Sequence, residues 1–206
     1  MIDALEQAAG RLVSRETLLL LERYVAHLRT ASLEQNLLAS STLDTMWQRH
    51  ILDSAQLLRL EPSRGASWID IGSGAGLPGL VIALLSEGPV TLVEPRRLRA
   101  AFLQDMVDEL SLGSRVTVVQ ARAERVSGPF DVITARAVAP LSKLLGMTLH
   151  LAHNGTVWAL PKGRTAKSEL AEAKRSWQCA VRSEVSCTDR DSTVLVLSGV
   201  RARSKP

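Results

Sequence analysis

The feature that most constrains the fold is a glycine-rich stretch, Gly72-Ser73-Gly74-Ala75-Gly76, set between two apolar runs. The preceding run, 68–71, suits a short buried strand, and the stretch at 79–86 suits a helix. Glycines let the backbone turn sharply and let a ligand approach the main chain without a Cβ in the way. A strand, a glycine loop and a helix in this order are the context in which a nucleotide or cofactor binds.

Short apolar runs alternate with helical stretches from residue 67 onward. Strands are expected at 68–71, 90–93, 116–119, 131–134 and 156–160, and helices at 79–86, 96–111, 140–151 and 168–178. This repetition predicts an α/β fold, a mostly parallel, doubly wound sheet with helices on both faces. The end of the chain differs, because 180–185 and 193–200 can pair as an antiparallel hairpin.

The first sixty residues are expected to form helices. Ser14 can cap a helix in which Leu18, Leu21 and Val25 recur at helical spacing, and a second helix is expected from Thr42. The stretch Glu61-Pro62-Ser63-Arg64-Gly65 then breaks the pattern. We therefore expect a helical N-terminal extension over 1–62 packed on the core, a main domain over 63–200, and a tail over 201–206.

Length and composition exclude several classes of protein. With 206 residues, 46% of them hydrophobic and 22% charged, the chain suits one globular domain. No apolar run approaches the roughly 18 residues of a membrane span, and the start lacks the pattern of a secretory signal. Two cysteines, Cys179 and Cys187, are too few for a disulfide scaffold or a four-cysteine zinc site. We expect a soluble cytoplasmic monomer without a metal.

Charge is distributed unevenly along the chain. Residues 137–206 carry 11 basic and 5 acidic side chains, whereas residues 1–136 carry 14 and 16. A basic C-terminal third suggests an anionic partner on one side of the fold, with a merely solvated basic face as the alternative. Because only seven residues are aromatic, binding of a nucleic acid would depend on charge and on the shape of the nucleic acid and not on a stacking platform.

Two interpretations compete for the glycines. Gly74, Gly76 and Gly79 spell the G-x-G-x-x-G pattern of dinucleotide-binding proteins, whereas Asp70 with Gly72, Gly74 and Gly76 spells D-x-G-x-G-x-G. The second pattern resembles the first motif of class I S-adenosylmethionine-dependent methyltransferases. Pro78 favours it, because a proline there removes a backbone donor that pyrophosphate would need but presets φ for the start of a helix.

The ends of later strands supply further candidates. Glu94 follows the second strand, where a carboxylate can accept hydrogen bonds from both hydroxyls of a ribose, whether in NAD or in S-adenosylmethionine. Arg96, Arg97 and Arg99 follow, which would suit NADP or a solvated first helical turn. Ala123-Glu124 follows the third strand, where such methyltransferases contact adenine, and Arg136 follows the fourth strand.

Several segments in one order resemble a single family. The matching segments are Asn36-Leu37, Arg49-His50-Ile51-Leu52-Asp53-Ser54, Asp70 to Gly79, Glu94 with Arg97, Ala101-Phe102-Leu103, Ala123-Glu124, Thr134-Ala135-Arg136-Ala137 and Leu160-Pro161-Lys162-Gly163. The family is the bacterial 16S ribosomal RNA guanine-N7 methyltransferase family, also called glucose-inhibited division protein B or rRNA small subunit methyltransferase G. The resemblance runs from about residue 18 to 198.

The resemblance implies a class I, Rossmann-like methyltransferase that uses S-adenosyl-L-methionine to methylate N7 of a guanine (guanine 527) in 16S ribosomal RNA, free or within the small ribosomal subunit. The cofactor contacts expected from the motif and the resemblance are Asp70, Gly72, Ser73, Gly74, Gly76, Leu77, Glu94, Ala123, Glu124 and Arg136. The candidates for contact with RNA are Arg49, His50, Arg97, Lys162, Arg164 and Lys167.

Guanine N7 has a free lone pair and no proton to lose, so we expect alignment of the reactants and no general base. Arg136 is the candidate for positioning the cofactor or the base, with a salt bridge to Asp70 or Glu124 as the alternative role. His50 and Asp53 lie one helical turn apart, and a structural role in docking their helix is favoured over contact with the substrate. Two other functions stay open: an NAD(P)-dependent oxidoreductase and a noncatalytic RNA- or ribosome-binding protein.

Overall fold

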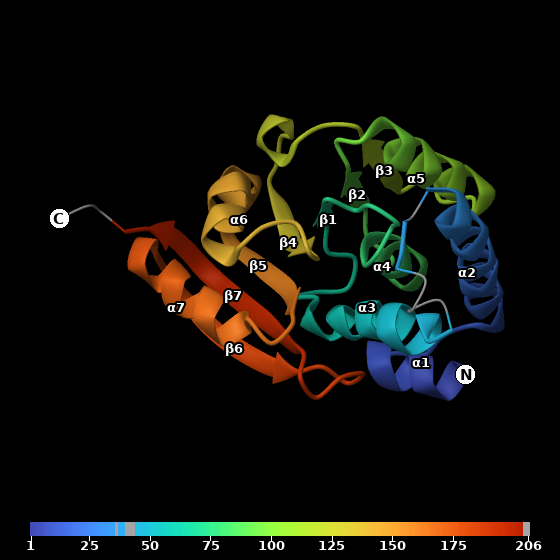
Figure 1. Cartoon of the computed structure of the whole chain (residues 1–206), viewed down its shortest axis with the longest axis horizontal. Coiled ribbons are helices and arrows are strands. Elements are labelled where there is room, and N and C mark those ends of the chain that lie inside the picture. The colour runs from blue at the N-terminus through green and yellow to red at the C-terminus, as the bar shows by residue number, and fades with distance from the viewer. Residues whose placement is uncertain (36, 40–43, 204–206) are drawn as a thin grey trace.

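The structure is a computed structural model that describes residues 1–35, 37–39 and 44–203. Its centre is a seven-stranded sheet in the order β3-β2-β1-β4-β5-β7-β6 (Figure 1). The strands are β1 (Trp68–Ile71), β2 (Val90–Val93), β3 (Val116–Val119), β4 (Phe130–Ala135), β5 (Ala152–Lys162), β6 (Trp177–Val185) and β7 (Thr193–Ala202). Strands β1 to β5 are parallel, and β7 pairs antiparallel with both β5 and β6. This confirms the doubly wound α/β prediction and the antiparallel hairpin.

Helices cover both faces of the sheet, as the alternating sequence pattern requires. The helices of the main domain are α4 (Gly79–Leu85), α5 (Arg97–Glu109), η4 (Ala123–Arg125), α6 (Leu141–Thr148), η5 (Leu149–Leu151) and α7 (Ala166–Ser176). Successive strand residues point to opposite faces. Trp68 of β1 therefore packs in the cluster that contains α4 and α5, whereas Ile69 and Ile71 pack in the cluster that contains α6.

The N-terminal segment adds helices to the α4 side of the sheet. They are α1 (Ile2–Ala9), α2 (Arg15–Gln35), the π-helical η2 (Trp47–Leu52), α3 (Asp53–Ala55) and η3 (Gln56–Leu60). Ser14 caps α2 as predicted, because its Oγ accepts a hydrogen bond of 3.1 Å from the Thr17 amide. Leu5, Leu21 and Tyr24 are buried in the same cluster as Trp68 and Leu80, so the extension shares a hydrophobic core with the sheet.

Several expected boundaries need correction. The helix expected at 168–178 ends at Ser176, because Trp177 and Gln178 pair with Ala202 and Arg201 and so belong to β6. The same pairing extends β7 two residues beyond the predicted end, into the segment expected to be a tail. Pro78 precedes α4 as its cap and is not its first helical residue. Asn36 and the helix start expected at Thr42 lie outside the described residues, as do residues 204–206.

Within the described residues, no helix combines the length and apolarity needed to cross a membrane.

Candidate functional site

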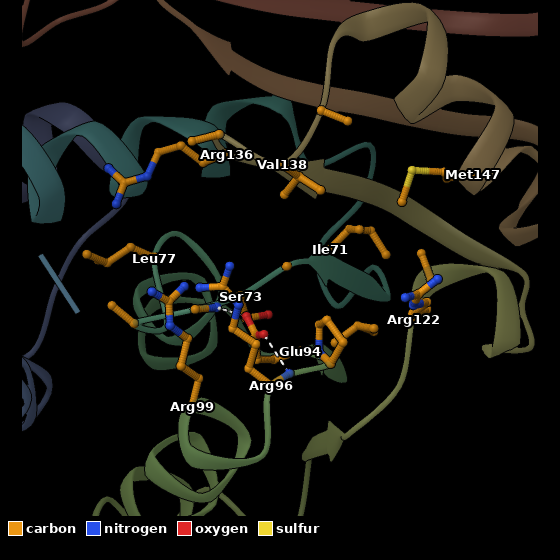
Figure 2. Close-up of a pocket in the computed structure, with 18 of the residues that line it drawn as sticks. Ile71, Ser73, Leu77, Glu94, Arg96, Arg99, Arg122, Arg136, Val138 and Met147 are labelled. Carbon is orange, nitrogen blue, oxygen red and sulfur yellow. Dashed lines mark hydrogen bonds between the residues drawn. The ribbon is translucent and has the colours of Figure 1, made fainter. Parts of the chain in front are cut away.

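A cavity of about 750 Å³ lies at the carboxyl ends of the parallel strands, the edge where open α/β sheets bind ligands. The segments that follow β1, β2, β3 and β4 all contribute to its wall (Figure 2). The expected contact residues that line it are Gly72, Ser73, Gly74, Leu77, Glu94, Ala123, Glu124 and Arg136. Four stretches far apart in the sequence therefore converge on one cavity.

The glycine loop adopts a backbone conformation that side chains rarely allow. Gly72, Gly74 and Gly76 have φ values of 67°, 54° and 88°, in the left-handed region that glycine occupies without strain. The amides of Gly72 and Ser73 both donate to the carbonyl of Val93, at 2.8 and 3.0 Å. The loop is thus fixed to the end of β2, next to Glu94.

Two of the expected contact residues lie behind the loop and do not line the cavity. Gly76 supports the tight turn, and a Cβ there would stand 2.4 Å from Leu80 Cδ1. Asp70 is only 1% exposed, because strand alternation points its side chain toward α4. Its Oδ2 accepts a hydrogen bond of 3.1 Å from the Gly79 amide at the start of α4. The structure therefore assigns Asp70 to the support of the loop and not to its ligand face.

Burial raises the pKa of Asp70 to about 7, although hydrogen bonds from Ser73 and Gly79 and the charge of Arg136 oppose the shift. Its other oxygen, Oδ1, is buried without a hydrogen-bond partner. A buried carboxyl with one unsatisfied oxygen favours the protonated form, since an isolated negative charge is costly away from water.

Glu94 is buried at the bottom of the cavity, where its two oxygens are held by backbone amides. Oε2 accepts a hydrogen bond of 3.0 Å from the Gly74 amide, and Oε1 accepts one of 2.9 Å from the Arg96 amide (Figure 2). The two amides therefore fix the orientation of the carboxylate. Each oxygen can still accept another hydrogen bond, which suits a pair of vicinal hydroxyls.

The wall of the cavity carries more positive charge than was expected from the sequence, which predicted Arg136 as its one basic contact residue. Arg96, Arg99, Arg122 and Lys143 line it together with Arg136. Arg97, which was expected to contact RNA, is exposed and does not line it. Residues three apart lie on the same side of a helix, so Arg96 and Arg99 at the start of α5 both face the cavity and Arg97 does not. The Arg-x-x-Arg spacing from 96 to 99 was the sequence signal that could have identified this pair.

Arg136 extends from the end of β4 toward the N-terminal extension. Its Nη1 donates a hydrogen bond of 3.0 Å to Nδ1 of His50, since a guanidinium carries only donors. The alternative salt bridge to Asp70 or Glu124 does not occur among the ion pairs of the described residues. Burial and the charge of Arg136 lower the pKa of His50 to about 4, so its imidazole is uncharged at neutral pH.

Asp53, one turn beyond His50, makes a separate connection. Its Oδ1 accepts hydrogen bonds from Gln56, Ser186 and Thr188 at 2.7, 3.0 and 3.1 Å. Ser186 and Thr188 belong to the turn between β6 and β7. His50 thus connects the extension to β4, and Asp53 connects it to the C-terminal hairpin.

A second, smaller cavity of about 130 Å³ lies beside the first. Arg136 lines both cavities, and Asp53, Lys162 and the start of β7 complete the wall of the second one. No local pattern predicts this cavity, because its walls come from residues more than a hundred positions apart.

The remaining RNA candidates differ in their surroundings. Lys162 is half-buried, and its Nζ donates to Glu169 at 2.8 Å and to the Ala139 carbonyl at 3.3 Å. Arg164 is exposed and pairs with Asp191, and the exposed Arg49 lies 4.0 Å from Asp189. Lys167 is exposed on α7. The expectation for Lys162 therefore needs correction, because its ammonium group joins β5 to α7 and is not presented to solvent.

Across residues 1–35, 37–39 and 44–203, no group of three or more histidine, cysteine, aspartate or glutamate side chains could hold a metal ion.

Known proteins resemble this chain in sequence over almost its whole length. The family described as rRNA small subunit methyltransferase G matches residues 17–195. A protein named ribosomal RNA small subunit methyltransferase G from Zymomonas mobilis is 44% identical, covering 98% of this chain and 93% of the relative. A protein of the same name from Rhizorhabdus wittichii is 47% identical, with coverages of 94% and 90%.

Solved structures resemble it in fold. A SAM-dependent methyltransferase from Aquifex aeolicus superposes with a TM-score of 0.59 at 15% sequence identity, covering 75% of this chain and 93% of the other. A TehB-like SAM-dependent methyltransferase from Corynebacterium glutamicum gives 0.57 at 15% identity, covering 84% and 98%. These similarities extend to the fold and no further.

Proposed function

This chain belongs to the rRNA small subunit methyltransferase G family, and we propose on that basis that it transfers a methyl group from S-adenosyl-L-methionine to N7 of a guanine in 16S ribosomal RNA. As a member of the family it is a methyltransferase with a class I, Rossmann-like fold. The observation that carries the proposal is the convergence of Gly72, Glu94, Ala123 and Arg136 on one cavity at the carboxyl edge of the sheet.

The residues of the cavity fit S-adenosylmethionine. Glu94 offers two carboxylate oxygens, already oriented by backbone amides, to the hydroxyls of the ribose. The turn at Gly72 lets the amino-acid part of the cofactor approach the main chain, and a Cβ there would stand 2.6 Å from Val138 Cγ2. Ala123 and Glu124 lie on η4, where the adenine would rest, and the arginines at the rim can pair with the cofactor carboxylate. Asp70 and Gly76 contribute through the shape of the loop.

The chemistry requires orientation more than proton transfer. S-adenosylmethionine supplies a methyl group that its sulfonium charge has already activated. The lone pair of guanine N7 forms a bond to the methyl carbon as the bond from that carbon to sulfur breaks. The protein must hold nitrogen, carbon and sulfur in line and exclude water. Within the described part of the chain, Arg136 has donors to spare beyond its hydrogen bond to His50, and we assign it to hold the target base.

The two other functions left open by the sequence lack support. In the dinucleotide-binding arrangement, six parallel strands follow the order 3-2-1-4-5-6. Here the antiparallel β7 is inserted between β5 and β6. The relatives that match most of the chain are named methyltransferases, which favours neither an oxidoreductase nor a noncatalytic binding protein.

We further propose that the partner is 16S ribosomal RNA or the small ribosomal subunit, that the protein acts in the cytoplasm where ribosomes assemble, and that one chain suffices. Support comes from the names of the relatives and from a cavity built by a single chain.

Two measurements test the proposal. Calorimetry should detect binding of S-adenosylhomocysteine, with NADH and NADPH binding much more weakly; preferential binding of a nicotinamide nucleotide would reject it. Transfer of tritiated methyl groups should then label 16S RNA, either free or in 30S particles, at a guanine N7. Absence of label in both substrates, with the cofactor bound, would indicate a noncatalytic protein.

A further inference from the structure

The second cavity is lined by charged side chains that the transfer of a methyl group does not by itself require. It is small, with room for about four water molecules at roughly 30 Å³ each. Among the described residues, its wall contains one carboxylate, Asp53, and the guanidinium of Arg136 at the border with the main cavity. The other cation in its wall, Lys162, is already paired with Glu169.

The carboxylate of Asp53 has one oxygen to spare. Its Oδ1 accepts three hydrogen bonds, from Gln56, Ser186 and Thr188. Those contacts fix the position of the side chain from both the extension and the hairpin. Oδ2 makes no hydrogen bond within the described part of the chain and is not a buried unsatisfied atom, so it is available to a ligand that donates hydrogen bonds.

Guanine presents its polar atoms in an order that matches this wall. Around one side of the base, N7 comes first, then O6, then the N1–H and N2–H₂ donors. If N7 faces the methyl group in the main cavity, O6 falls at the border between the cavities, beside Arg136. The N1–H and N2–H₂ donors then face the second cavity, beside Asp53.

We propose that the second cavity holds the Watson–Crick edge of the target guanine, with Asp53 as the residue that selects guanine. Arg136 donates to O6, and Asp53 Oδ2 accepts from N1–H and N2–H₂. An adenine would place an acceptor, N1, against the carboxylate, and like groups facing one another in a desolvated site are strongly disfavoured. This assignment rests on the proposed methyl transfer to guanine N7.

A phosphate group is the alternative occupant for a cavity beside Arg136. The carboxylate of Asp53 argues against it, because two negative charges would share a small space while Lys162 is neutralised by Glu169. The base edge is therefore the occupant that the charges favour.

Inosine tests this assignment, because it keeps N7, O6 and N1–H but lacks the N2 amino group. The substrate is 16S RNA assembled with either guanosine or inosine at the methylated position, and the measurement is the single-turnover rate of methyl transfer. The wild-type protein should prefer guanosine by about tenfold or more, as expected for a hydrogen bond to a charged group. Intrinsic differences between the two bases cancel when the ratio is compared among variants.

Asp53→Asn is the decisive variant. The asparagine oxygen can replace Oδ1 and keep the contacts to Ser186 and Thr188, whereas its NH₂ group would replace Oδ2 with a donor. The guanosine-to-inosine ratio should fall to near one. Asp108→Asn is the matched control: Asp108 is exposed on α5 and also accepts from a glutamine amide, Gln104, at 3.0 Å. Its ratio should equal that of the wild type.

Each result decides the matter. A ratio unchanged in Asp53→Asn, even with slower transfer, would show a structural role only and overturn the proposal. If Asp53→Asn bound the guanosine RNA and the inosine RNA more tightly than the wild type by the same factor, the cavity would hold a phosphate, and the proposal would also be overturned. If Asp53→Asn transfers nothing, the same ratio is measured as RNA affinity in the presence of S-adenosylhomocysteine. A wild-type protein that methylates neither RNA contradicts the proposed function itself, whereas one that methylates both equally contradicts only the role of Asp53.

Discussion

The hydroxyl of Tyr24 on α2 donates a hydrogen bond of 2.7 Å to the carbonyl of Ala75 in the glycine loop. Tyr24 is fully buried, and burial raises the pKa of its hydroxyl, so the group remains a neutral donor. A residue of the N-terminal extension thus supports the loop on which the proposed cofactor rests. The extension therefore supports the proposed cofactor site, although the sequence pattern placed it outside the main domain.

Tyr24→Phe should therefore weaken both folding and cofactor binding. The variant leaves the Ala75 carbonyl without a partner in a buried position, which costs about 1–3 kcal/mol of unfolding free energy. Because the loop loses a support, we expect the affinity for S-adenosylhomocysteine to fall several-fold. Urea unfolding and calorimetry measure the two effects. Thr30→Val on the same helix is the control, since Thr30 is exposed and its hydroxyl donates to the Ala26 carbonyl of its own helix. Equal losses of stability and affinity in the two variants would contradict the role of Tyr24.

Gly79→Ala should destabilise the fold by about 1–3 kcal/mol, the usual cost of overpacking a core. A Cβ at this position would stand 2.3 Å from Leu92 Cδ2 and 2.6 Å from Asp70 Oδ2, so α4 would have to move away from the sheet. Gly113→Ala provides the comparison, because nothing lies within 4 Å of a Cβ there. Chemical denaturation should show a clear loss for the first variant and a change within about 0.5 kcal/mol for the second. Similar midpoints would mean that α4 adjusts freely.

Asp70 should make the stability of the protein depend on pH. Its pKa is raised to about 7 in the folded state from an ordinary value near 4, so between these values the folded protein binds more protons than the unfolded chain. The free energy of unfolding contributed by this group is therefore highest below pH 4 and falls as the pH rises toward 7. Asp70→Asn should remove that decline while keeping the acceptor for the Gly79 amide.

The measurement is urea unfolding of both proteins at intervals from pH 4 to 8. The difference in unfolding free energy between Asp70→Asn and the wild type should increase with pH over this interval. A difference that is constant with pH would show that Asp70 is ionised throughout and would contradict its raised pKa.

Arg136→Ala should reduce methyl transfer by at least about 100-fold, because in the proposed reaction the target base would lose a charged donor that holds it in line. The same variant should raise the pKa of His50 from about 4 toward its ordinary value, since one of the causes of the low pKa is removed while burial remains. NMR titration of the imidazole, assigned with a His50→Gln variant, measures the second effect. Full activity would contradict the proposed contact between Arg136 and the base. An unchanged His50 titration would contradict the contact between Arg136 and His50.

Lys162 and Lys167 should behave differently when each is replaced by alanine. Lys162→Ala removes the link to Glu169 and Ala139, so it should lower stability by about 1–2 kcal/mol and leave the salt dependence of RNA binding unchanged. Lys167→Ala should leave stability unchanged and reduce the slope of log affinity against log salt by about one, as for a lost phosphate contact. Urea unfolding and RNA affinity at several salt concentrations measure the two effects. A reduced salt slope in Lys162→Ala, with an unchanged slope in Lys167→Ala, would contradict these roles.

Most of the order of elements could be predicted because it depends on neighbours in the chain. Short apolar runs predicted the bounds of β1, β2 and β3 to the residue, and the glycines at 72, 74 and 76 required a turn that only glycine makes easily. The start of β6 was missed, because Trp177 continues a helical pattern and only its pairing with Ala202 draws it into the sheet.

The sequence by itself determined the strand–loop–helix order, the glycine turn and the acid after β2, since each follows from local spacing and backbone freedom. Only the tertiary structure decided which way polar groups face and which distant ones meet. Asp70 lies under the loop because α4 covers the face of β1 that carries its side chain. His50 meets Arg136 across 86 positions, and Asp53 meets Ser186 across 133. Such pairs depend on how the strands are arranged side by side in the sheet, and no local pattern in the chain encodes that arrangement.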